Sequence, residues 1–108
     1  MEKIYNKLVR DNIPDIIHND GEKPITRILS NEEYKQELEK KLFEEYQEVL
    51  NATTSKERIE ELADMLEIII SLAKLESKTL DDVVEVAKTK RLKRGGFEKR
   101  IYLEKIIK

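Results

Sequence analysis

The fold follows from the stretch between Lys41 and Ile70, KLFEEYQEVLNATTSKERIEELADMLEIII. On both sides of the polar segment NATTS, apolar residues recur three and four positions apart, which is the spacing of one helix face. The break itself offers Ser55 as the N-cap of a second helix. The stretch therefore predicts two helices joined by a short turn.

Capping signals extend this pattern along the chain. SNEE, from Ser30, is typical of a capping box and starts the first long helix, which we expect to end near Leu50. The second helix should reach about Ser77, and a third should begin after Thr79 and stop at Gly95 and the glycine that follows it. Since the connections are short, we predict that the three helices pack antiparallel.

The two ends of the chain carry other signals. A helical turn is expected between Pro14 and Gly21, with His18 as a half-buried structural residue. PITRIL, from Pro24, and KRIYLEKII near the C-terminus alternate apolar and polar residues. We predict that these two segments pair as a short β-ribbon beside an all-α, antiparallel helical bundle.

Composition agrees with one helical domain over residues 1–108. Charged residues make up 41% of the chain and aromatic residues only 6%, which is typical of helices and not of a β-sandwich. With no cysteine and a single histidine, any metal site must use oxygen ligands. No apolar run is long enough to span a membrane and no signal peptide is evident, so we expect a cytoplasmic protein.

Charge is unevenly distributed along the chain. Between residues 31 and 67 there are twelve acidic and five basic residues, whereas residues 88–100 hold seven basic residues and one acidic residue. An acidic centre with a basic tail suits a ligand made of a metal ion and phosphates. The alternative is that both regions are solvated faces that keep a small domain soluble.

A helical wheel distinguishes these two interpretations for the first long helix. Its apolar stripe includes Leu38 and Leu42. Glu45 falls within this stripe, Glu48 lies on its flank, and Glu44 points nearly opposite. Burial of a carboxylate is unfavourable without a compensating partner, so Glu45 is a candidate ligand.

The second long helix is apolar on two sides. One face carries Ile59, Leu62 and Leu66, and the other carries Ile68 in line with Glu61 and Asp64. Carboxylates from two facing helices would repel one another unless a cation compensated them. Mg²⁺ is a hard ion that prefers oxygen ligands and completes its coordination with water and phosphates, so we predict a Mg²⁺ site. Because one face of this helix stays uncovered within the chain, we also expect a homodimer or a higher homo-oligomer.

The motifs EEYQE and ELAD together resemble the EExxE…ExxD signature of the MazG-like all-α nucleoside triphosphate pyrophosphohydrolases. This superfamily also includes phosphoribosyl-ATP pyrophosphohydrolase and dimeric dUTPases. The flanks YNKLVRDNIP and KRLKRGGFEKRIYL are similar to those of a subgroup of predicted house-cleaning pyrophosphatases, so the resemblance covers nearly the whole chain.

The resemblance implies specific roles. Metal-binding and catalytic roles fall on four carboxylates: Glu45, Glu48, Glu61 and Asp64. Triphosphate binding falls on basic residues after the third helix, by position Lys90 and Arg94. The family often has an asparagine ahead of these basic residues, and VVEVAKTKR has none, which is a departure from the family's pattern.

Lys7 and Arg10 are the other basic candidates, because a segment at the start of the domain can fold over phosphates. The alternative for Arg10 is an ordinary surface pair with Asp11.

Three functions are compatible with these observations, and the first of them is the one that the family resemblance implies. The first is Mg²⁺-dependent cleavage of a nucleoside triphosphate or a related pyrophosphate compound between the α and β phosphorus, in nucleotide-pool house-cleaning. The second is a non-catalytic regulatory or nucleic-acid-binding helical module that uses the basic run, although the pI near 5.6 and the few aromatic residues argue against nucleic acid as a partner. The third is a structural helical dimer in which the acids meet basic residues of a partner.

Overall fold

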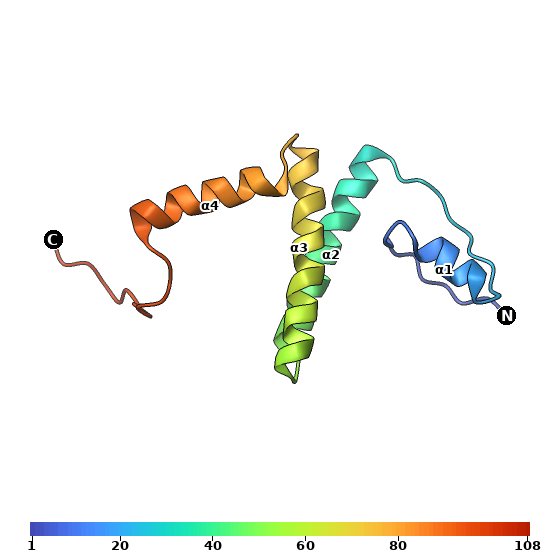
Figure 1. The fold of residues 1–108 in the computed structure, drawn as a ribbon, viewed down its shortest axis with the longest axis horizontal. Helices are drawn as coiled ribbons and strands as arrows, with labels where there is room; N and C mark the ends of the chain where they lie inside the picture. The colour runs from blue at the N-terminus through green and yellow to red at the C-terminus, as the bar shows by residue number, and fades with distance from the viewer.

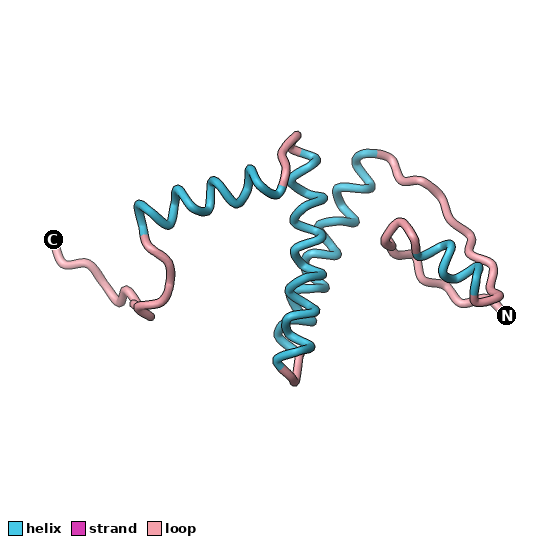
Figure 2. Tube along the Cα trace, in the orientation of Figure 1, coloured by secondary structure: helices cyan, strands magenta, loops and turns pink.

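The computed structural model describes residues 1–108 and contains four helices and no strands (Figures 1 and 2). The helices are α1 (Ile13–Asn19), α2 (Asn31–Asn51), α3 (Ser55–Leu75) and α4 (Leu80–Arg94). The all-α prediction is confirmed.

The predicted capping box starts α2. The backbone N–H of Glu33 donates to the Ser30 hydroxyl at 3.2 Å, and the Glu33 carboxylate accepts from the Ser30 backbone N–H at 3.3 Å. Helix α3 is capped one residue earlier than predicted, because the Thr54 hydroxyl, and not Ser55, accepts from the N–H of Glu57 at 3.1 Å. The Glu57 carboxylate in turn accepts from the N–H of Thr53, which fixes the turn between the helices.

The boundaries of α4 also follow the predicted signals. The N–H of Asp82 donates to the Thr79 hydroxyl at 3.2 Å, and the Thr79 N–H donates to the Asp82 carboxylate at 2.8 Å. At the other end Gly95 has a φ of 82°, a left-handed conformation that glycine adopts without strain, and its N–H donates to the Arg91 carbonyl at 2.8 Å.

Helices α2 and α3 pack against each other as a hairpin, which is the centre of the molecule (Figure 1). Leu38 of α2 and Ile68 of α3 are the two buried residues of the chain. Met65 and Leu72, on the same face of α3 as Ile68, are partly buried. The inner face of the hairpin is therefore the one that the helical wheel selected, and its core is small.

The third helix of the predicted antiparallel bundle does not lie along this hairpin. Helix α4 extends away from the end of α3, and the chain measures 65 × 35 × 25 Å (Figure 1). Its radius of gyration is 18.7 Å, against about 13 Å for a compact domain of this length. The apolar residues of α4 are not gathered on one side of the helix, so it has no continuous stripe to bury against the hairpin.

The predicted β-ribbon does not form. The segment that begins at Pro24 and the C-terminal segment lie at opposite ends of the molecule, and both are irregular (Figure 2). Two strands must lie side by side to exchange hydrogen bonds. The alternation of apolar and polar residues in each segment does not predict whether the two segments meet. The prediction for His18 was also wrong, since it is exposed on α1.

None of the four helices combines the length and the apolar composition needed to cross a lipid bilayer.

Candidate metal centre

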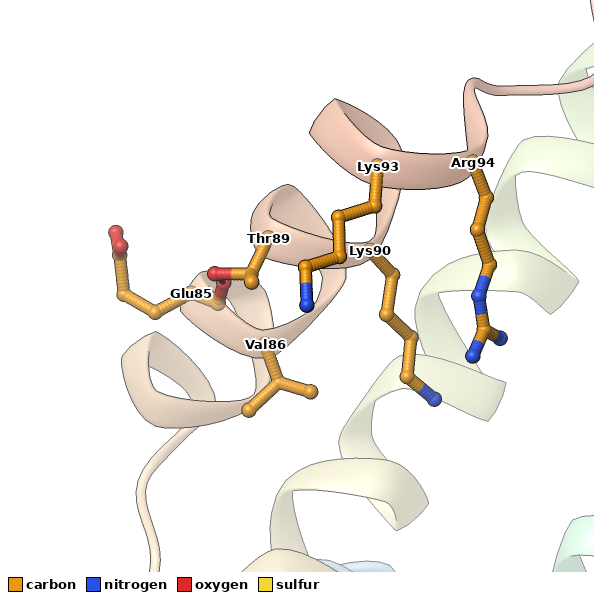
Figure 3. A pocket seen from close by; sticks show the side chains of 6 residues that line it. All are labelled: Glu85, Val86, Thr89, Lys90, Lys93 and Arg94. Atoms are coloured by element: carbon orange, nitrogen blue, oxygen red, sulfur yellow. Dashed lines mark hydrogen bonds between the residues drawn. The ribbon is translucent and has the colours of Figure 1, made fainter.

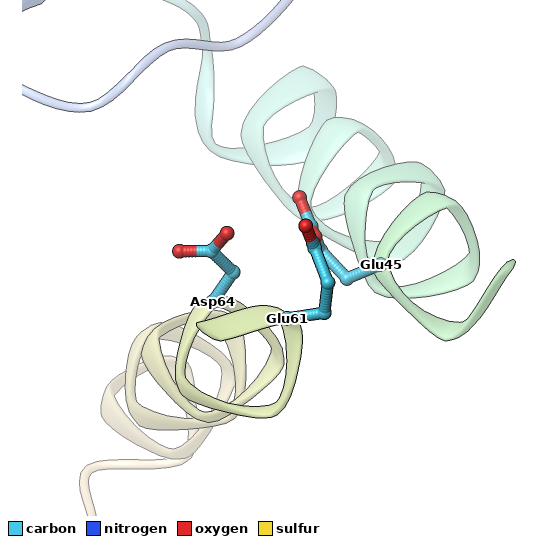
Figure 4. Close-up of side chains that lie close together, drawn as sticks. All are labelled: Glu45, Glu61 and Asp64. Atoms are coloured by element: carbon cyan, nitrogen blue, oxygen red, sulfur yellow. The ribbon is translucent and has the colours of Figure 1, made fainter. Parts of the chain in front are cut away.

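Three of the four predicted carboxylates come together between α2 and α3. Glu45 projects from α2, and Glu61 and Asp64 project from α3 toward it (Figure 4). One oxygen from each of the three lies within 4.8 Å of the others, and all three residues are partly buried. We refer to Glu45, Glu61 and Asp64 as the acidic triad.

Helix periodicity explains why these side chains meet. Asp64 lies four residues before the buried Ile68, and Glu61 lies three residues before Asp64, so both belong to the face of α3 that packs on α2. Glu45 lies seven residues after the buried Leu38, which is two helical turns along the same face of α2. The packing that buries the two apolar residues therefore also brings the acids together.

The environment of the acidic triad disfavours the charged form of Glu45. The pKa of Glu45 is raised, first because burial disfavours its charged form and second because its protonated form hydrogen-bonds to Glu61. The negative charges of Asp64 and Glu61 raise this pKa further, and the nearby ammonium of Lys41 acts in the opposite direction. A cation between the helices would relieve this repulsion.

One cation already contacts the acidic triad. The Arg10 guanidinium donates to the Asp64 carboxylate at 2.7 Å, although the two residues are 54 positions apart in sequence. The sequence predicts Arg10 as a phosphate ligand or as a surface partner of Asp11, and the contact with Asp64 is not among these predictions. No local signal predicts it, because the pair depends on how the N-terminal segment lies on the helices.

Glu48, the fourth predicted ligand, is not part of the acidic triad and is exposed on α2. It follows Glu45 by three residues, and a rotation of about 300° moves it to the edge of the helix face. Glu44 is also outside the triad. Its half-exposed carboxylate lies 3.9 Å from the Lys41 ammonium, one turn back on the same helix.

The basic candidates of α4 lie away from the acidic triad. Lys90 and Arg94 line a shallow groove on α4 of about 380 Å³, together with Lys93 (Figure 3). The three cationic side chains extend from the helix in similar directions, and Glu85 lies at the other end of the groove (Figure 3). Within one chain, therefore, this basic groove and the acidic triad are separate features.

Lys7 lies in a different place again. It lines a small hollow between the N-terminal segment and α2, whose other walls include Glu37 and Glu44. Of the four predicted phosphate ligands, only Arg10 makes direct contact with the acidic triad.

The donor set of the acidic triad suits a hard divalent cation. It consists of carboxylate oxygens alone, which Mg²⁺ prefers, and the three residues are only partly buried, so water can reach them. Burial, and after it the neighbouring Glu61 and Asp64, raises the pKa of Glu45, and a bound cation would favour its charged form. Glu45, Glu61 and Asp64 are therefore the residues that fit such an ion.

Comparisons with known proteins add little to this geometry. No protein-family model matches the chain, and no solved structure is similar to it. An uncharacterized protein of Mycolicibacterium smegmatis is 46% identical over 48 residues, which is 44% of this chain and 49% of that protein. The matched region thus spans about half the length of either protein, and the candidate site rests on the residues described above.

Proposed function

We propose that the protein is a Mg²⁺-dependent nucleoside triphosphate pyrophosphohydrolase, which releases a nucleoside monophosphate and pyrophosphate, and that it serves in nucleotide-pool house-cleaning. The observation that carries this proposal is the acidic triad, in which three carboxylates from two helices lie within 4.8 Å of one another. The resemblance of EEYQE and ELAD to the MazG-like signature is consistent with it, as are the all-helical architecture and the hairpin of α2 and α3.

Each residue has a defined part in this proposal. Glu45, Glu61 and Asp64 hold the metal, and Glu48, one turn beyond Glu45, is proposed as a fourth carboxylate of the set. When bound, Mg²⁺ offsets charge on the phosphates and lowers the pKa of a coordinated water. A carboxylate of the set orients the attacking water and accepts its proton.

Lys7, Arg10, Lys90 and Arg94 are the proposed phosphate-binding residues, because a triphosphate carries several negative charges. Lys90 and Arg94 lie apart from the acidic triad of their own chain, so their role is supported by the family resemblance and not by this geometry. Arg10 is the best supported of them, since its guanidinium lies 2.7 Å from Asp64.

We also propose that the protein works as a homodimer or a higher homo-oligomer. Its accessible surface is 10487 Å², whereas a compact monomer of 12.8 kDa exposes about 6,300 Å². The difference of about 4,200 Å² far exceeds the ~800 Å² that each partner contributes to a standard interface. Ile59, Leu62 and Leu66 form an exposed apolar face on α3, which a second copy of the hairpin would cover.

The assembly is tested by Leu66→Glu, which places a charge on that exposed apolar face. Light scattering at micromolar concentration should show an oligomer for the wild type and a monomer for Leu66→Glu. Lys74→Glu, on the polar side of α3, should remain oligomeric. A monomeric wild type would refute the proposed assembly.

The activity is tested with a panel of standard and modified nucleoside triphosphates in Mg²⁺, scoring pyrophosphate against orthophosphate. Pyrophosphate release should depend on Mg²⁺ and should be lost in Glu45→Gln and Asp64→Asn. Glu44→Gln makes the same chemical change outside the acidic triad and should retain most of the activity. Equal activity in Glu44→Gln and Glu45→Gln would refute the proposed site.

A second candidate function is binding of a polyanion such as nucleic acid. The basic groove of Lys90, Lys93 and Arg94 supports it, because these cations lie together on one exposed helix. A fluorescent single-stranded oligonucleotide distinguishes the two functions. Micromolar, salt-sensitive binding that Lys93→Gln weakens would favour this function, because Lys93 lies in the basic groove and is not one of the residues proposed to bind the triphosphate. No binding at moderate salt would favour the pyrophosphohydrolase instead.

A further inference from the structure

Arg10 links the N-terminal segment to the acidic triad. Its carbonyl accepts a hydrogen bond from the backbone N–H of Ile13 at 3.0 Å, so its backbone is held at the start of α1. Its side chain reaches from there to Asp64 at 2.7 Å. The Arg10 backbone is thus ordered by a turn at the start of α1, and only its flexible side chain reaches the acidic triad.

The contact between Arg10 and Asp64 is suited to exchange. The side chains of the two residues are 60% and 44% exposed, so water screens the pair and its net contribution to stability is small. The guanidinium engages one oxygen of a carboxylate that also belongs to the acidic triad. A divalent cation that coordinates Asp64 therefore competes with Arg10 for the same negative charge.

We propose that Arg10 is a built-in counterion of the acidic triad, which a divalent cation displaces from Asp64 and which then binds a phosphate group of the substrate. This inference rests on the proposed function, since it takes the acidic triad to be the metal site. A guanidinium matches the geometry of a phosphate as well as that of a carboxylate, so the released side chain has a ready partner next to the metal. Arg10 is accordingly a substrate-binding residue whose availability depends on the metal.

The alternative is that Arg10 is a fixed structural partner of Asp64. A fixed partner that orients Asp64 would help the metal to bind, and its removal would weaken metal binding. A displaced counterion opposes the metal, and its removal would strengthen metal binding. The two roles thus predict effects of opposite sign on the same affinity.

The experiment measures two affinities in the full-length protein and in Arg10→Gln. Binding of Mn²⁺ alone is followed by the electron paramagnetic resonance signal of the free ion. Binding of imidodiphosphate, a pyrophosphate analogue that resists hydrolysis, is followed by calorimetry in saturating Mn²⁺. We expect Arg10→Gln to tighten Mn²⁺ binding by about two- to five-fold, as an exposed ion pair allows, and to weaken imidodiphosphate binding at least five-fold.

Lys3→Gln is the matched control. It removes one positive charge from the same segment, but the Lys3 ammonium lies over the Tyr5 ring at 5.0 Å and has no carboxylate of the acidic triad as its partner. It should change both affinities by less than half as much as Arg10→Gln. Arg10→Lys keeps the charge but loses the planar guanidinium. It should bind Mn²⁺ as weakly as the wild type does and should recover only part of the wild-type imidodiphosphate affinity.

Unchanged or weaker Mn²⁺ binding in Arg10→Gln would overturn the displacement, and unchanged imidodiphosphate binding would overturn the transfer to phosphate. Failure of the wild type to bind Mn²⁺ at all would instead refute the metal site of the proposed function, so the two failures are distinguishable.

Discussion

Replacement of Glu45 by Gln should stabilise the metal-free protein. The substitution removes one negative charge from a group whose oxygens lie within 4.8 Å of one another, and the new amide can still donate to Glu61. Two unit charges at that separation repel by about 1 kcal/mol in water and by about 3.5 kcal/mol at an effective dielectric constant of 20. Because the acidic triad is only partly buried, we expect a gain near the lower value, which corresponds to an increase of about 4 to 8 °C in Tm.

The same substitution should remove the stabilisation that a metal provides. A ligand that binds only the folded state raises its stability by about 2.7 kcal/mol at one hundred times its Kd. Thermal unfolding followed by circular dichroism at pH 7, with and without millimolar Mg²⁺, should therefore show a rise in Tm with Mg²⁺ for the wild type. The variant should start from a higher Tm and respond little to Mg²⁺.

Glu44→Gln is the control for this experiment. It makes the same chemical change one residue away, and it loses only a 3.9 Å surface contact to Lys41, which contributes at most a few tenths of a kcal/mol. Its metal-free Tm should stay within about 2 °C of the wild type, and its response to Mg²⁺ should be retained. A lower metal-free Tm in Glu45→Gln, or the same Mg²⁺ response in both variants, would refute the electrostatic reasoning.

Three further predictions concern pH, capping and packing. Because the pKa of Glu45 is raised, its ionisation destabilises the fold at pH values above the usual glutamate pKa and has no effect below it. The higher Tm of Glu45→Gln relative to the wild type should therefore disappear as the pH falls below about 4. The Mg²⁺ affinity of the wild type should fall over the same acidic range. Hydrogen bonds from Arg27 and Ser30 lower the pKa of Glu33 to about 2, so Glu33→Gln should lower the Tm at pH 7. Melting curves should show that this difference in Tm shrinks as the pH falls from about 4 toward 2. Leu38→Ala should lower the free energy of unfolding, measured in urea, by about 2 to 5 kcal/mol because Leu38 is buried. Leu92→Ala is the control, because the Leu92 side chain is exposed. An equally small loss of stability in both variants would mean that the hairpin does not hold the fold together.

The sequence alone determined the helices and the direction of their side chains. Capping residues such as Ser30 and Thr79 satisfy the free N–H groups of a helix within a few residues of themselves, so local sequence was sufficient to locate helix starts to within one residue. Helical periodicity is also local, and it predicts Glu45, Glu61 and Asp64 as inward-facing acids without any information about their separation in space. The error at α3, where Thr54 and not Ser55 is the cap, arose because both residues can accept the same hydrogen bond.

Which of these residues meet depends on the tertiary structure. It left Glu48 outside the acidic triad, because a position on the flank of a helix face reaches a facing helix only when the packing angle allows it. It placed α4 away from the hairpin and brought Arg10 to Asp64 across 54 positions. Such contacts depend on how whole segments are arranged in space, and a periodicity measured along one helix carries no information about the position of another segment.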